Sequence, residues 1–110
     1  MRKLLLNDYQ VEAKNEKGEL AEVPYQVKRS LVAVLFAPEL RLDAVELLER
    51  DKLANKINDA IDGYVLLEDA EYSKLESAIK TVRGLGRNEV ELVKRILGAE
   101  KVEVTEKEGR

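Results

Sequence analysis

The chain has 110 residues, the size of a single domain, and 45% of them are hydrophobic, enough to build a core. Its 19 Lys and Arg against 22 Asp and Glu give a net charge of −3, which argues against a general nucleic-acid binder, because such domains are usually basic. The absence of Cys and His excludes disulfides, thiolate nucleophiles, zinc sites built on Cys and Ser-His-Asp triads.

Charged residues make up 37% of the chain and amide side chains are few, which is typical of a thermophilic source. The longest apolar run, Leu31 to Ala37, is far shorter than the roughly 20 residues that span a bilayer. Only three leucines follow the basic residues near the start, too few for the apolar region of a signal peptide. We therefore expect a cytoplasmic protein without a membrane span.

Residues 3 to about 25 predict a β-hairpin. Apolar and polar residues alternate in both arms, over Tyr9 to Ala13 and over Ala21 to Tyr25, with a polar turn between them. Leu4 and Leu6 lie at even positions, whereas the apolar residues from Tyr9 to Ala13 lie at odd positions, so in one regular strand the two sets would face opposite sides. Either the first strand bulges just before Tyr9, or the hairpin begins only there.

Residues 26 to 37 are the most apolar stretch. Helical spacing favours a buried helix ended by Pro38, with a buried strand as the alternative. Because the run from Leu31 to Phe36 is apolar on every side, it forms the central core helix or a subunit interface, and the two can coexist. The interface candidates are Leu31, Val34, Leu35 and Phe36.

Residues 42 to 61 give the clearest helix prediction, with Gly63 as the expected C-cap. Glu46 and Arg50 have the i,i+4 spacing of an ion pair. The expected inward-facing stripe consists of Leu42, Val45, Leu48, Leu53, Ile57 and Ile61.

Residues 64–67 (YVLL) predict a short strand, followed by a helix from Asp69, its expected N-cap, to about Arg83. The expected inward face of this helix consists of Tyr72, Leu75, Ile79 and Val82. Glycines before a helix start can hold a phosphate, but the segment 84–88 (GLGRN) matches no phosphate-loop spacing and indicates a turn.

Asn88 and Glu91 have the spacing of a capping box, which predicts the start of a last helix that Gly98 ends. Val102 and Val104 alternate with a polar residue and suggest a final short strand. We expect one α+β domain over residues 1–104, with an N-terminal hairpin, about four helices and one or two short strands. Residues 105–110 predict a solvated C-terminal tail.

The segment 80–95 is basic in an otherwise acidic protein. Its positive charges are Lys80, Arg83, Arg87, Lys94 and Arg95. If the two helices form a hairpin, Arg83 and Arg87 flank its tip, where a phosphate backbone or an acidic partner could bind. A solvated surface is the alternative, because basic residues near helix ends also offset the helix dipole.

Five carboxylates between residues 59 and 71 could attract a hard cation. They are Asp59, Asp62, Glu68, Asp69 and Glu71. The spacing of an EF-hand is absent, and Asp69 and Glu71 are explained as charges at a helix start. No two of the 22 acidic residues stand out as a catalytic pair, so we predict no catalytic residue, no metal ligand and no cofactor.

Near the middle of the chain a strand leads into a helix start with the pattern Leu-x-Asp/Glu-x-Glu, as Leu66-Leu67-Glu68-Asp69-Ala70-Glu71-Tyr72. A polar hairpin, an apolar helix and an acidic helix precede it, and a final helix follows. In this layout most of the chain resembles the small accessory proteins of tailed bacteriophages. The resemblance implies a phage-encoded protein with a binding role in the host cytoplasm, and it transfers no site residues.

The favoured hypothesis is a non-enzymatic protein-protein interaction protein, such as a phage assembly or host-directed factor, which binds a partner or itself through an apolar surface. The alternative is a nucleic-acid-associated regulator that uses the basic 80–95 segment. A third hypothesis is an enzyme that works with carboxylates and Mg²⁺.

Overall fold

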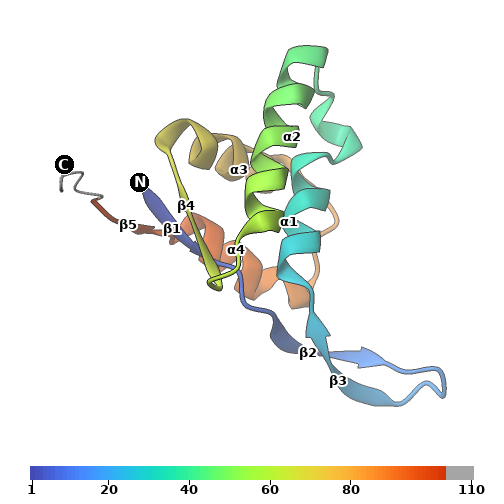
Figure 1. Cartoon of the computed structure of the whole chain (residues 1–110). Coiled ribbons are helices and arrows are strands. Elements are labelled where there is room, and N and C mark those ends of the chain that lie inside the picture. Colours follow the sequence, from blue (N-terminus) through green and yellow to red (C-terminus); the bar gives the residue numbers. More distant parts are fainter. Residues whose placement is uncertain (104–110) are drawn as a thin grey trace.

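Figure 1 shows the computed structural model, which describes residues 1–103. Within this range the chain forms five strands and four α-helices. In chain order they are β1 (Arg2–Leu5), β2 (Tyr9–Lys14), β3 (Leu20–Tyr25), α1 (Val27–Leu35), α2 (Ala44–Asp59), β4 (Tyr64–Leu67), α3 (Asp69–Thr81), α4 (Val90–Leu97) and β5 (Glu100–Lys101). Two 3-10 turns, η1 (Pro38–Leu40) and η2 (Arg87–Glu89), precede α2 and α4. The predicted α+β fold with an N-terminal hairpin and four helices is confirmed.

β1 is the middle strand of an antiparallel sheet with the order β4-β1-β5. The hairpin therefore begins only at Tyr9, which was one of the two predicted alternatives, and Leu4 and Leu6 are buried in the body of the molecule. The final strand β5 ends immediately before Val102, slightly earlier than predicted. Val104 and the predicted tail, residues 105–110, lie outside the described residues.

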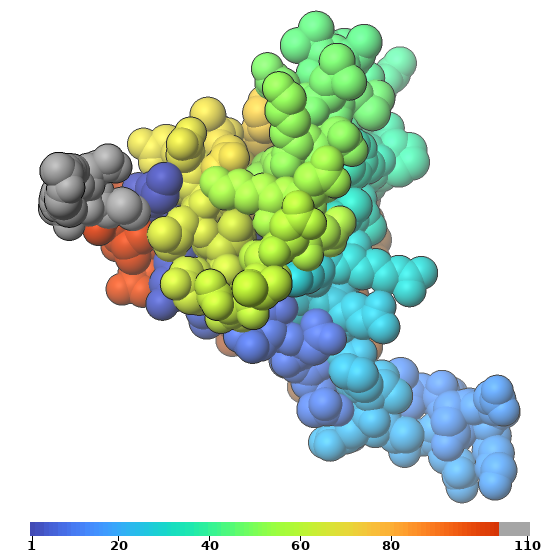
Figure 2. Space-filling view, viewed as in Figure 1, coloured from blue at the N-terminus to red at the C-terminus, as the bar shows by residue number. Residues whose placement is uncertain are grey.

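The hairpin of β2 and β3 projects from the body as a separate two-stranded sheet (Figures 1 and 2). At its base Tyr9 pairs with Tyr25, and the two rings stack with their centroids 4.8 Å apart. Tyr9 Oη donates a hydrogen bond to the Asn88 carbonyl oxygen at 2.7 Å. Burial raises the pKa of the Tyr25 hydroxyl to about 12. The radius of gyration is 15.5 Å, larger than the roughly 13 Å of a compact chain of this length, because the hairpin extends outward.

One hydrophobic core joins the three-stranded sheet to all four helices. Its most deeply buried large side chains are Leu4, Val27, Leu31, Leu35, Leu53, Ile57, Leu67, Leu75, Leu92 and Ile96. α1 packs against both α2 and α3, so the most apolar stretch forms the predicted buried helix and not a strand. It ends at Leu35, before Pro38 opens η1.

The boundaries of α2 and α3 depend on local caps that differ from two of the predicted ones. Asp43 is the N-cap of α2, and its Oδ1 accepts a hydrogen bond from Glu46 N at 2.8 Å. α2 ends at Asp59, so Gly63 is not its C-cap; with a φ of 81° it forms the turn before β4. The N-cap of α3 is Glu68 and not Asp69.

The start of α4 also differs from the prediction, which placed a capping box at Asn88 and Glu91. The 3-10 turn η2 comes first, and within it Glu89 Oε1 accepts a hydrogen bond from Gly86 N at 2.6 Å. Gly98 ends α4 as predicted. Within residues 1–103 no helix has both the length and the apolarity needed to cross a membrane.

The first testable prediction concerns the core. Leu31→Ala removes a fully buried side chain of α1, so we expect it to lower the free energy of unfolding by about 2–5 kcal/mol. Leu20→Ala, in the exposed part of the hairpin, is the matched control and should change it by less than about 0.5 kcal/mol. Urea unfolding followed by circular dichroism measures both, and equal effects would contradict the described core.

Candidate protein-binding surface

The first half of α2 has the reverse of the polarity expected of a surface helix, with charged side chains on its inward side. Arg50 is only 7% exposed, and its Nε donates to Glu46 at 2.8 Å, which confirms the predicted i,i+4 ion pair. A second nitrogen of the guanidinium group, NH1, donates to the carbonyl oxygen of Leu35 at 3.1 Å. Arg50 therefore ties α2 to the end of α1.

Lys74 of α3 extends this charged cluster. Its Nζ lies 3.0 Å from Glu46 Oε2 and 2.7 Å from Glu49 Oε1. Hydrogen bonds from Arg50 and then Lys74 lower the pKa of Glu46, and hydrogen bonds to Glu49 and Glu46 raise the pKa of Lys74. The cluster joins α1, α2 and α3, and it lies on the same side of α2 as the buried Leu53 and Ile57.

Because the charged side of the first half of α2 faces inward, the aliphatic side chains of that half face outward. Val45, Leu47 and Leu48 are 67%, 45% and 68% exposed, and we call these three residues the α2 face. The prediction that Val45 and Leu48 face inward is wrong, as it is for Ile61, which is 92% exposed. The step of five residues from Leu48 to Leu53 was the sign in the sequence, because one helix face needs steps of three or four.

A small cleft adjoins the α2 face where η1 meets the first turn of α2. Its volume is about 280 Å³, and its lining consists of Phe36, Ala37, Pro38, Arg41, Leu42 and Leu47. Arg41 adopts the left-handed conformation with a φ of 52°, and its N–H donates to the Pro38 carbonyl oxygen at 3.1 Å. Leu47 belongs to both the cleft and the α2 face, so the two are continuous.

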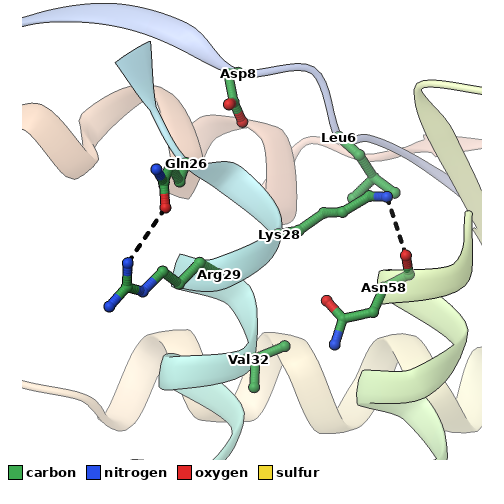
Figure 3. A pocket seen from close by; sticks show the side chains of 7 residues that line it. All are labelled: Leu6, Asp8, Gln26, Lys28, Arg29, Val32 and Asn58. Carbon is green, nitrogen blue, oxygen red and sulfur yellow. Dashed lines mark hydrogen bonds between the residues drawn. The ribbon is translucent and has the colours of Figure 1, made fainter. Parts of the chain in front are cut away.

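A larger depression lies elsewhere, between the start of α1 and the end of α2 (Figure 3). Its volume is about 680 Å³, and two of its polar side chains, Asp8 and Lys28, already cap helices. Asp8 Oδ1 accepts from Val27 N at 2.9 Å at the start of α1. Lys28 Nζ donates to the carbonyl oxygens of Asn58 and Ala60, at 3.1 and 2.6 Å, at the end of α2. These contacts give Asp8 and Lys28 a structural role.

The predicted interface residues lie in or against the core of the same chain. Leu31, Val34 and Leu35 are buried, and Phe36 is partly buried and packs against the core. These four side chains leave little surface for a partner. Exposed aliphatic side chains lie on α2, and others lie on β1, the hairpin and α4.

The predicted basic residues do not form one free patch. Arg95 donates to Glu91 at 3.0 Å and to the Asn7 carbonyl oxygen at 2.6 Å, and its guanidinium group lies over the ring of Tyr9. It thereby holds the base of the hairpin against α4. Lys80 pairs with Glu76 at 3.4 Å. The remaining three, Arg83, Arg87 and Lys94, are exposed.

The predicted acidic residues are also partly used in structural contacts. Glu71 pairs with Lys56 at 2.8 Å and accepts from Glu68 N at 2.9 Å. In the part of the chain that the structure describes, no three carboxylates converge in a way that could hold a metal ion.

No family model, curated protein or solved structure matches the chain. The resemblance to small phage proteins therefore stays a prediction.

The second testable prediction concerns the charged cluster under the α2 face. Glu46 has a lowered pKa in the folded chain, so its stabilisation is fully present above the ordinary value of 4.5 and is lost as the pH falls through the folded value. Glu46→Gln should lower the free energy of unfolding by about 1 kcal/mol at pH 7. The difference from the wild type should shrink as the pH falls through the folded pKa of Glu46, because protonation then removes the charge of the wild-type carboxyl.

Urea unfolding between pH 7 and pH 3 measures this difference. Glu16→Gln, in the exposed turn of the hairpin, is the control and should have little effect at any pH. A difference for Glu46→Gln that stays constant down to pH 3 would show that the carboxylate charge does not stabilise the fold.

Proposed function

We propose that this chain is a non-enzymatic interaction protein that binds a protein partner on the α2 face. One observation carries the proposal: Val45, Leu47 and Leu48 are exposed on a helix whose inward side is charged and held by ion pairs. Exposed apolar patches of this kind are typical of protein-binding surfaces. The cleft beside Leu47 gives the patch a concave edge that an apolar side chain of a partner can fill.

The charged cluster supports a binding role because it keeps the aliphatic side chains outside. Turning α2 so that Leu48 faced inward would break the contacts of Glu46 and Arg50 and leave their charges without partners. Burying one such aliphatic side chain in an interface contributes about 1.5–3 kcal/mol before the entropic cost of association. The α2 face is therefore prepared for a partner and needs no refolding to bind one.

An assembly or host-directed role, as the resemblance to phage accessory proteins implies, would use a surface of this type. The nucleic-acid alternative has less support. Arg95 and Lys80 take part in ion pairs within the chain, which leaves three of the five predicted cations for a nucleic acid, on a protein of net charge −3.

The third testable prediction uses a charge placed on the α2 face. Leu48→Asp should abolish capture of the protein partner, because it puts a carboxylate in the apolar contact. Ile61→Asp is the matched control: Ile61 is even more exposed but lies beyond the other end of α2, so capture should be unchanged. The measurement is affinity capture from a host lysate treated with nuclease, followed by titration of the purified partner.

Circular dichroism must first show that both variants fold like the wild type. Loss of binding by Leu48→Asp alone supports the proposal. Equal binding by all three proteins contradicts it. Partners that disappear on nuclease treatment would favour the nucleic-acid alternative.

A further inference from the structure

We propose that the hairpin of β2 and β3, which we call the arm, packs against the arm of a second copy of this chain. The apolar faces of the two arms meet with their strands antiparallel, across a two-fold axis. The arm is a different surface from the α2 face, so this interaction goes beyond the proposed function.

The arm has one apolar and one polar face. Residues directly opposite each other in an antiparallel pair point to the same side, and the side alternates along each strand. The apolar face therefore consists of Tyr9, Val11, Ala13, Ala21, Val23 and Tyr25.

Most of this apolar face is uncovered within residues 1–103. Only Tyr9 and Tyr25, at the base of the arm, pack against the core, and Val23 is 37% exposed. The rest of the arm projects from the body (Figure 2). A two-stranded sheet is only marginally stable in water unless something packs on its apolar side. The face is therefore suited to a packing partner.

The edges of the arm are less suited to a partner than its face. On β3, Pro24 has no N–H to donate to an added strand. On β2, the carbonyl oxygen of Glu12 already accepts a hydrogen bond from Asn88 Nδ2 at 3.4 Å. Both features oppose the addition of a strand at the edge and favour packing on the apolar face.

Side-chain size favours an antiparallel pair of such faces. When the two-fold axis lies level with Glu12, Val11 of one copy lies over Ala13 of the second copy. Val23 lies over Ala21 in the same way, so each large side chain fills the space above a small one. A parallel pair would instead place Val11 over Val23 of the second copy and leave a gap between the alanines.

The charged side chains of the two strands stay outside this contact. Glu12, Lys14 and Glu22 lie at even positions, on the polar face of the arm. Like charges therefore do not meet at the centre of the pair, where the side chains are aliphatic.

In the antiparallel pair the turn of each arm reaches the base of the other. Tyr9 of one copy then lies level with Asn15 of the second copy, where the turn begins. A depression of about 450 Å³ lies at the base of the arm, with Tyr9 and Val11 on one side and Arg87 and Val90 on the other. This depression leaves room for the turn of the second copy.

Charges at this contact are also complementary. The turn carries two carboxylates and one ammonium group, on Glu16, Glu19 and Lys17. In the depression Arg87 is exposed and has no ion pair within residues 1–103, whereas Glu91 is paired with Arg95 at 3.0 Å. The carboxylates of the turn can therefore pair with Arg87 of the second copy, and two-fold symmetry repeats this contact.

The size of the faces sets the expected strength of the pair. Each strand of the arm has six residues, so each face measures only roughly 20 Å by 10 Å. Interfaces of this size are weak, so we expect a reversible dimer.

The fourth testable prediction is a dimer that forms through the arm. Sedimentation equilibrium of the full chain from about 10 µM to about 1 mM, the affinity range of small interfaces, should show monomers converting to dimers. Val11→Asp should raise the dissociation constant at least tenfold, because it puts a carboxylate in the aliphatic centre. Leu20→Asp is the matched control: it lies on the polar face of the same arm and should not change the constant.

Arg87→Glu keeps the test decisive if Val11→Asp disturbs the hairpin, because Arg87 is an exposed residue outside the arm. It should raise the dissociation constant severalfold, since it sets a carboxylate against those of the turn. Circular dichroism must show that each variant folds like the wild type.

Paramagnetic NMR then tests the direction of pairing, and the chain suits it because it has no cysteine of its own. Lys17→Cys carries a nitroxide label in the turn and is mixed with isotope-labelled wild type. The antiparallel pair predicts broadening of the signals of Arg87 and Val90 in the wild-type copy. Broadening confined to the turn of the wild-type copy would indicate a parallel pair and overturn the inference.

The outcomes separate this inference from the proposed function. A wild type that stays monomeric at about 1 mM overturns the second copy as the partner of the arm. A dimer that neither Val11→Asp nor Arg87→Glu weakens overturns it as well. If Leu48→Asp weakens the dimer and Val11→Asp does not, the copies meet through the α2 face and not through the arm.

Discussion

The charged cluster of Glu46, Arg50 and Lys74 is the constraint on which the surface of this protein depends. Lys74 links α3 to α2, and Arg50 links α2 to the end of α1. Partly buried charges are tolerated only when they are paired, so these contacts, together with the burial of Leu53 and Ile57, oppose rotation of α2 about its axis. The aliphatic side chains on the other side of the helix are consequently exposed, although the chain has ample core elsewhere.

The rest of the fold positions this helix from both ends. Asp43 caps its first turn, and Lys28 of α1 donates to the last carbonyl oxygens at its other end. Below this point Leu53 and Ile57 are buried in the common core, so the second half of α2 is an ordinary amphipathic helix. α2 is thus anchored by apolar contacts in one half and by ion pairs in the other, and only the half held by ion pairs has an apolar outer side.

Periodicity and local chemistry predicted the fold class, the four helices and the Glu46–Arg50 pair, because these depend on short-range spacing. One feature was missed, which is the side of the first half of α2 that faces inward. Contacts between distant parts of the chain hold that side, from Lys74 to Glu46 and from Arg50 to Leu35. The apolar run of α1 was predicted to be a core helix or an interface, and α2 and α3 bury it. The step of five residues from Leu48 to Leu53 was the one local sign that the predicted apolar stripe does not lie on one side of α2.

The most direct test of this account is the solvent exposure of the aliphatic methyl groups of α2 in dilute solution. NMR spectra of the methyl groups, recorded with and without a water-soluble paramagnetic probe, measure it. We expect the signals of Val45 and Leu48 to be strongly attenuated and those of Leu53 and Ile57 to be protected. Protection of Leu48 at concentrations where the chain is monomeric would mean that α2 is rotated, and it would remove the basis for a binding surface on this helix.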